Sequence, residues 1–286
     1  MASEFADAAR LIPGIDNIIE FDKRDGWRGI LKLRRLFFRK YDLICDFQNS
    51  PRSAFLRTFT FPMMWTKAKR YRLRRWLLIR FKLNLYRASV PVPLRYLNSL
   101  AVLGAVDDQR GLGLRVPEAQ KKDSTTNTIM LCPGSKHATK RWPIEHWSEL
   151  ARALQFAGFE IVVCGTQDEA ELCRAVAPSA RQLISAGLSE IAQEMQSAAA
   201  VVCNDSGLMH LATGVGARVI ALFGPTVEQF GFFPFRGQSE VIQTDLNCRP
   251  CSAFGGSKCP LGHHNCMNHI TPEAVKAATL EFSQRQ

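Results

Sequence analysis

The feature that most constrains the fold is a regular alternation of short apolar runs and longer amphipathic stretches between residues 128 and 223. We predict five strands there, at Thr128–Cys132, Glu160–Cys164, Gln182–Ile184, Ala200–Asn204 and Arg218–Phe223. The helices predicted between them cover Ile144–Ala157, Asp168–Val176, Leu188–Ala198 and Leu208–Gly214. Strands and helices alternating at this spacing form a parallel sheet with helices on both faces. Ligands of such sheets bind beyond the carboxyl ends of the strands, so the loops there carry the chemistry.

The loop that follows the first of these strands combines small residues with cations. Gly134 lets the backbone approach a ligand closely, and Lys136, Lys140 and Arg141 supply positive charge. Pro143 suits the first turn of the next helix, whose free N–H groups favour phosphate. The loop therefore fits an anion site, although an ordinary surface loop can have the same composition.

Two further loops of the same kind follow later strands. In the first, Asp205 or Ser206 can cap a helix, Gly207 allows close approach and His210 lies on the first helical turn. Taken singly, Asp205 could be only a helix cap and His210 only a packed histidine. The second loop is Gly224-Pro-Thr226. Three successive loops with small, hydroxyl or phosphate-compatible groups at one sheet edge indicate one binding site.

These motifs together carry a family resemblance. The runs Pro133-Gly-Ser135, Lys140-Arg-Trp-Pro143, Asn204-Asp-Ser-Gly-Leu-Met-His-Leu-Ala212 and Ala221-Leu-Phe-Gly-Pro-Thr226 resemble glycosyltransferase family 9, the heptosyltransferases of lipopolysaccharide core assembly. The resemblance spans roughly Tyr41 to Ala278. It implies an α/β protein of the GT-B architecture, with two Rossmann-like domains built on parallel sheets. We expect an incomplete N-terminal, acceptor-side domain over residues 1–122 and a nucleotide-sugar-binding domain over residues 123–286.

The resemblance also implies a reaction and roles for matched residues. Such enzymes move a heptose, typically from ADP-L-glycero-D-manno-heptose, to the lipopolysaccharide inner core, inverting the anomeric carbon without a metal or cofactor. Lys140 would neutralise the diphosphate, Asp205 would hold sugar hydroxyls, and His210 would meet phosphate with the backbone of Ser206 and Gly207. Gln167 would contact the nucleoside or the sugar. The expected nucleotide-sugar-binding set is Gly134, Ser135, Lys140, Gln167, Asp205, Ser206, Gly207, His210, Gly224 and Thr226.

One departure from the family pattern concerns the catalytic base. Family members usually begin with a strand, a Gly-Asp loop and a helix, and the aspartate of that loop is the proposed base. This chain has no such segment, so the catalytic residue stays unassigned. We favour a misplaced or truncated start over a degraded gene copy. Asp16, Asp22 and Asp25 are the nearest carboxylates, but none follows a recognisable strand.

The charge of the first third points to an anionic partner. Residues 23 to 95 hold 20 Lys or Arg and three Asp, in a chain of net charge +11. Such a field attracts nucleic acid, anionic phospholipid or an anionic glycolipid, although a solvated helical face would also fit. Because the aromatic residues form no RNA-binding signature, we expect a lipopolysaccharide acceptor and no nucleic acid. We leave open two alternatives: a catalytically impaired nucleotide-sugar-binding remnant and a basic nucleic-acid-binding protein.

Two remaining sequence features bear on location and metal content. No apolar run is long enough for a membrane span and the first twenty residues do not resemble a signal peptide, so we expect a cytoplasmic protein, with peripheral contact at the inner face of the inner membrane. Four cysteines gather near three histidines, at Cys248, Cys251, Cys259 and Cys266. Their spacing could suit zinc, but it matches no standard finger. We expect instead a metal-free packed loop near the nucleotide-sugar site.

Overall fold

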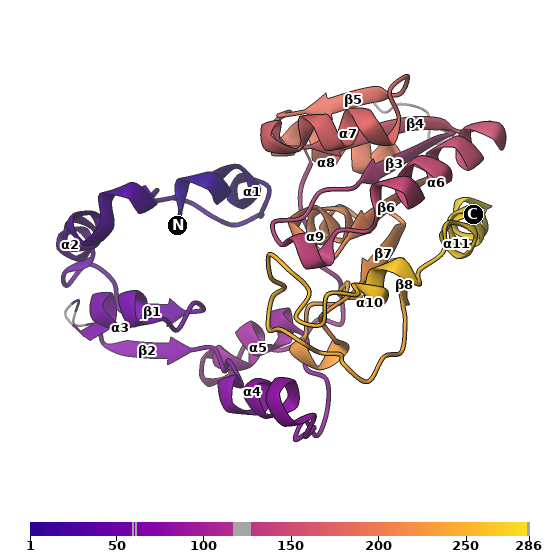
Figure 1. Cartoon of the computed structure of the whole chain (residues 1–286). Helices are drawn as coiled ribbons and strands as arrows, with labels where there is room; N and C mark the ends of the chain where they lie inside the picture. The colour runs from indigo at the N-terminus through magenta and orange to yellow at the C-terminus, as the bar shows by residue number, and fades with distance from the viewer. Residues whose placement is uncertain (59, 61, 117–126, 285–286) are drawn as a thin grey trace.

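The structure is a computed structural model that describes residues 1–58, 60, 62–116 and 127–284. Its main feature is a six-stranded sheet in which every neighbouring pair of strands is parallel (Figure 1). The strands are β3 (Thr128–Cys132), β4 (Glu160–Gly165), β5 (Arg181–Ile184), β6 (Ala200–Asn204), β7 (Val219–Phe223) and β8 (Ser239–Gln243). They lie in the order β5-β4-β3-β6-β7-β8, the doubly wound order of a Rossmann domain. The predicted parallel α/β sheet is confirmed.

Five of the six strands of this sheet were predicted, each within one residue of its observed bounds, and the sixth, β8, was missed. The central strands β6 and β7 are buried along their whole length, which is why they are continuous apolar runs. Strand β8 lies at the sheet edge and is only half-buried. Its sequence, Ser-Glu-Val-Ile-Gln, is therefore too polar to stand out as a strand.

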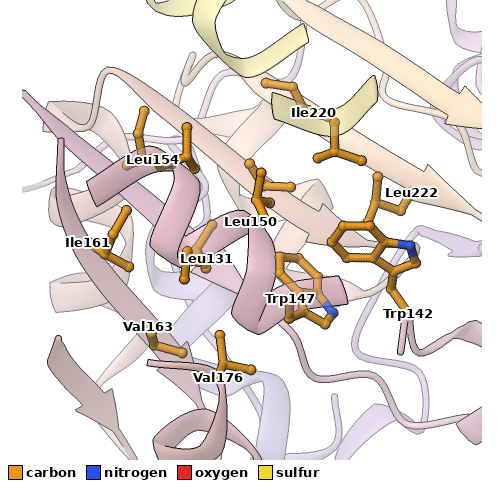
Figure 2. Close-up of a cluster of buried hydrophobic side chains, with 14 of the residues drawn as sticks. Leu131, Trp142, Trp147, Leu150, Leu154, Ile161, Val163, Val176, Ile220 and Leu222 are labelled. Atoms are coloured by element: carbon orange, nitrogen blue, oxygen red, sulfur yellow. The ribbon is translucent and has the colours of Figure 1, made fainter. Parts of the chain in front are cut away.

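Helices cover both faces of this sheet, as predicted. The elements are α6 (Ile144–Phe156), α7 (Ala170–Val176), α8 (Leu188–Ser197), α9 (Gly207–Gly214), α10 (Asn265–Asn268) and α11 (Pro272–Gln284). Helix α6 buries Trp147, Leu150 and Leu154, at helical spacing, in a core with residues of β3, α7 and α11 (Figure 2). Helices α8 and α9 form the core on the opposite face. The loops that connect the strands to these helices therefore lead to both faces of the sheet.

The N-terminal part is smaller and more open (Figure 1). Its elements are α1 (Ala6–Arg10), α2 (Gly26–Phe37), β1 (Leu43–Asp46), α3 (Pro51–Thr58), β2 (Met64–Lys67), α4 (Arg72–Phe81) and α5 (Val92–Ser99). Strands β1 and β2 form a two-stranded parallel sheet. The basic amphipathic stretch from Trp27 to Lys40 forms most of α2, and the apolar run from Tyr41 to Phe47 contains β1. The stretch 55–87, in which aromatic residues lie among Lys and Arg, contains β2 and α4.

The N-terminal part packs against the rest of the chain at several places, including Leu11 and Val92. Leu11, just after α1, belongs to the core beneath α8 and α9, and its carbonyl accepts a hydrogen bond from the N–H of Arg115. The N–H of Val92 in α5 donates to the carbonyl of Gly231. The domain boundary predicted at residues 122 and 123 lies outside the described residues and stays a prediction. None of the described helices combines the length and apolar character needed to cross a membrane.

Candidate functional site

The candidate site lies where the strand order of the large sheet reverses direction. Strands β3 and β6 are neighbours, and their ends are in register, with Cys132 opposite Cys203. The chain leaves β3 toward α6 on one face and leaves β6 toward α9 on the other. The two loops therefore separate at the carboxyl edge of the sheet, beyond which the ligands of such sheets usually bind.

A buried ion pair joins these two loops. The Nζ atom of Lys140 lies 2.6 Å from Oδ2 of Asp205, and the two side chains are only 9% and 4% exposed. The hydroxyl of Thr226, from the loop after β7, donates to the same carboxylate oxygen at 2.6 Å. All three predicted loops thus converge on the Asp205 carboxylate. Because charges removed from water interact strongly, a ligand that enters here meets a strong local field.

Two residues outside the expected nucleotide-sugar-binding set hold the loop after β3 in shape. The side-chain amide of Asn204, at the end of β6, donates to the carbonyl of Pro133 at 2.7 Å, and its oxygen accepts from the N–H of Trp142 at 3.2 Å. Arg141 donates from Nε to the carbonyl of Ser135 at 2.8 Å. The signal for Asn204 was an amide at the end of an otherwise apolar strand, since a buried amide needs partners.

The N-terminus of α9 lies at the same edge of the sheet and has unused hydrogen-bonding capacity. Ser206 occupies the cap position without a side-chain cap bond, and its hydroxyl is buried without a protein partner. A Cβ placed on Gly207 would meet no atom within 4 Å, so space is open at the first turn. Burial lowers the pKa of His210 below its ordinary value of 6.5, which keeps the imidazole neutral at pH 7. Free N–H groups and the helix dipole make this end of α9 suited to an anion.

The loop after β4 contributes a carboxylate that sequence reasoning missed. Gln167 is exposed, and its side-chain oxygen accepts a hydrogen bond from Ser185 at 3.3 Å. Glu169 instead lies against Gly134, where a Cβ would overlap its carboxylate. The same carboxylate accepts from the N–H of Thr166 at 3.1 Å, completing a capping box. The spacing Thr-x-x-Glu was the available signal.

The loop after β7 is fastened by the cysteine-rich segment, residues 248–266. Arg249 donates to the carbonyl of Gly224 at 2.5 Å and to that of Thr226 at 2.9 Å. The N–H of Cys251 donates to the carbonyl of Pro225 at 3.3 Å. The expectation of a loop packed beside the predicted binding loops is confirmed. Among the residues that the structure describes, no group of three or more ligating side chains could hold a metal ion.

Asp22, one of the three N-terminal carboxylates considered above, is poorly suited to act as the catalytic base. Asp22 accepts hydrogen bonds from the side chain and the N–H of Arg24, and these bonds lower its pKa to about 2. A carboxylate with so low a pKa is a weak proton acceptor at neutral pH. Asp22 is therefore a poor candidate for the base, in line with our leaving that role unassigned.

Comparison with known proteins identifies the family of this chain. The family model of Glycosyltransferase family 9 (heptosyltransferase) matches residues 30–259. Lipooligosaccharide heptosyltransferase 2 of Haemophilus influenzae is 32% identical over 155 residues, which cover 51% of this chain and 44% of that protein. The match thus spans somewhat less than half of that relative's length.

Two solved structures share the fold. The E. coli ADP-heptose lps heptosyltransferase II superposes with a TM-score of 0.70 at 20% identity, covering 99% of this chain and 87% of that one. The E. coli heptosyltransferase WaaC with ADP gives a TM-score of 0.72 at 20% identity, covering 98% and 88%. The GT-B architecture expected from the resemblance is confirmed. With four fifths of its residues matched by the family model, the chain belongs to glycosyltransferase family 9, the heptosyltransferases.

Proposed function

We propose that the protein transfers a heptose from ADP-heptose, or from a closely related nucleotide-sugar, to the lipopolysaccharide inner core. The observation that carries the proposal is the buried Lys140–Asp205 pair beside the open N-terminus of α9. Family membership supplies the reaction class, and the relative from Haemophilus influenzae is a lipooligosaccharide heptosyltransferase. WaaC, which has the same fold, was solved with ADP.

The nucleotide-sugar would bind with its diphosphate between Lys140 and the first turn of α9. As the glycosidic bond breaks, the electron pair moves to the departing phosphate oxygen, so negative charge grows there. The Lys140 ammonium and the N–H groups of Ser206 and Gly207 would stabilise that charge. Neutral His210 would offer or accept a hydrogen bond without adding a second cation.

Asp205 would change partner when the nucleotide-sugar binds. Once phosphate oxygens attract Lys140, the Asp205 carboxylate can accept hydrogen bonds from sugar hydroxyls, while Thr226 keeps one of its oxygens oriented. Gly134, Ser135 and Gly224 would complete the wall, and Gln167 would reach the nucleoside or sugar from the next loop. Positive charge on the protein would do the work that a divalent cation does in other transferases, which supports metal independence.

The chemistry proposed is a single displacement with inversion. An acceptor hydroxyl oxygen bonds to the anomeric carbon from the face opposite the diphosphate, and the bond from that carbon to the phosphate oxygen breaks. The hydroxyl proton passes to a base that remains unassigned in this chain. The diphosphate leaves as ADP.

The N-terminal part would receive the acceptor at the inner face of the inner membrane. Helix α2 presents exposed Trp27, Leu31 and Leu36 among its arginines, and α4 presents exposed Leu73 and Trp76. Apolar side chains interleaved with cations suit the boundary of an anionic lipid surface. The same cations would attract the anionic groups of a lipopolysaccharide core, placing the acceptor and the membrane on one side of the protein.

Calorimetry with ADP-heptose, ADP and GDP-mannose tests the binding step. We expect the wild type to prefer ADP-heptose, and Asp205→Ala and Lys140→Met to lose that preference. Lys136→Ala is the matched control, because it removes an exposed lysine from the same loop. A folded wild type that binds none of the three compounds would refute the proposal. Release of ADP in the presence of acceptor separates a transferase from a protein that only binds the nucleotide-sugar.

A further inference from the structure

The short 3-10 helix that carries Lys140 is held by a segment more than a hundred residues away. This helix, η4 (Ala138–Lys140), contacts residues 255 and 256 of the cysteine-rich segment. The N–H and the hydroxyl of Thr139 donate to the carbonyl of Gly256 at 3.1 and 3.2 Å. The N–H of Gly256 in turn donates to the Thr139 hydroxyl at 2.8 Å. Three hydrogen bonds thus join Thr139 to Gly256.

A histidine adds a second attachment to the same turn. Nε2 of His264 lies 2.9 Å from the carbonyl oxygen of Thr139. Because a carbonyl oxygen only accepts, Nε2 must carry the proton of this bond. The backbone of Thr139 is therefore held at its N–H by Gly256 and at its carbonyl by His264, directly before Lys140.

Gly255 fixes the position of the lysine side chain itself. Its φ is +100°, which favours glycine, and a Cβ there would lie 2.6 Å from Cβ of His137 and 3.2 Å from Cγ of Lys140. The glycine backbone thus packs on the aliphatic part of Lys140. The ammonium at the end of this side chain lies 2.6 Å from Oδ2 of Asp205.

We propose that Gly255, Gly256 and His264 form a clamp that positions Lys140 for the diphosphate of a bound nucleotide. Gly255, Gly256, Thr139 and His264 are positioning residues in this proposal, since they act through Lys140 and not on the ligand. The proposal rests on the function proposed above, which makes a nucleoside diphosphate the ligand. A lysine held in place loses less side-chain freedom on binding than a mobile one, so the clamp raises affinity for phosphate specifically.

Two variants loosen the clamp in different ways. Gly255→Ala forces His137 and Lys140 to move, and Thr139→Val removes the hydroxyl that bonds Gly256 while keeping the side-chain volume. Gly262→Ala is the matched control for the first variant, since Gly262 also has a positive φ, +75°, with no atom within 4 Å of a Cβ. Thr139→Ser is the control for the second variant, because serine keeps the hydroxyl.

The readout is the affinity of the full chain for ADP, by calorimetry, and for adenosine, by NMR titration. We expect both clamp variants to bind ADP roughly tenfold more weakly, as when one hydrogen bond to a charged group is lost, with adenosine affinity unchanged. Both controls should bind ADP like the wild type. If ADP and adenosine affinities fall together, or if Gly262→Ala loses as much ADP affinity as Gly255→Ala, the clamp is refuted while nucleotide binding stands. A wild type that fails to bind ADP refutes the proposed function and the clamp with it.

Discussion

Lys140 and Asp205 lie 65 positions apart in the sequence, yet their charged atoms are 2.6 Å apart and both side chains are more than nine-tenths buried. A buried pair of this kind is sensitive to the loss of either partner, because the remaining charge stays in a poorly solvated site.

Removal of Asp205 should therefore destabilise the fold. We expect Asp205→Ala to lower the free energy of unfolding by about 3 kcal/mol, measured by urea denaturation at pH 7. Combining it with Lys140→Met should recover part of that loss, since no unpaired charge then remains. A double variant whose loss equals the sum of the two single losses would contradict this account.

Stability should decrease in mild acid. Burial lowers the pKa of His210 below 6.5, so the unfolded chain binds more protons than the folded chain once the pH falls below that value. We expect the free energy of unfolding to be insensitive to this group above about pH 7 and to decrease as pH falls through 6. His210→Gln should reduce this pH dependence, measured by urea denaturation at a series of pH values. The free energy of unfolding of His210→Gln should still depend somewhat on pH, because burial also lowers the pKa of His137.

Gly134 and Glu169 should behave as coupled positions. Gly134→Ala places a Cβ against the Glu169 carboxylate, and we expect a loss of about 1 to 3 kcal/mol. Glu169→Ala alone should cost about 1 kcal/mol through the lost capping box. In the double variant, Gly134→Ala should cost clearly less than it does alone. Additive losses in the double-mutant cycle would show that the two groups do not meet.

Arg75 should hold the N-terminal part against the large sheet mainly through packing. Its guanidinium lies 5.0 Å from the ring centre of Phe254 and 5.5 Å from that of Phe230, and burial lowers its pKa. We expect Arg75→Ala to lower the melting temperature by about 3 °C or more, whereas Arg75→Met should retain most of the stability because it keeps an apolar stem. Arg80→Ala, on the exposed side of α4, is the control. Equal effects of Ala and Met at position 75 would favour the cation–π contact over packing.

The exposed tryptophans of the N-terminal helices should mediate binding to anionic lipid. We expect Trp27→Ser and Trp76→Ser to reduce cosedimentation with phosphatidylglycerol vesicles, and high salt to reduce it further. Phe156→Ser is a matched control, since Phe156 is 94% exposed but lies on α6 in the other part of the chain. If Phe156→Ser has the same effect, binding is not specific to the N-terminal helices.

The elements whose signal is local could be predicted from the sequence. The strands β3 to β7 and the helices between them follow from apolar periodicity, because the residues of each buried face lie within a short stretch of the chain. The three loops with glycine, hydroxyl and cationic residues were likewise found from the sequence, since parallel strands bring their carboxyl ends to one edge. The edge strand β8 was missed because a half-buried strand carries polar residues.

Which side chains contact one another could be learned only from the folded structure. The contacts of Lys140 with Asp205, Thr139 with Gly256, and Gly134 with Glu169 join different loops, and no periodicity encodes them. The same holds for Leu11, which is buried in a core whose other residues begin more than a hundred positions later. Such contacts depend on how strands are ordered and how loops pack, so they arise from the folded arrangement as a whole, whereas local patterns set only the elements that enter it.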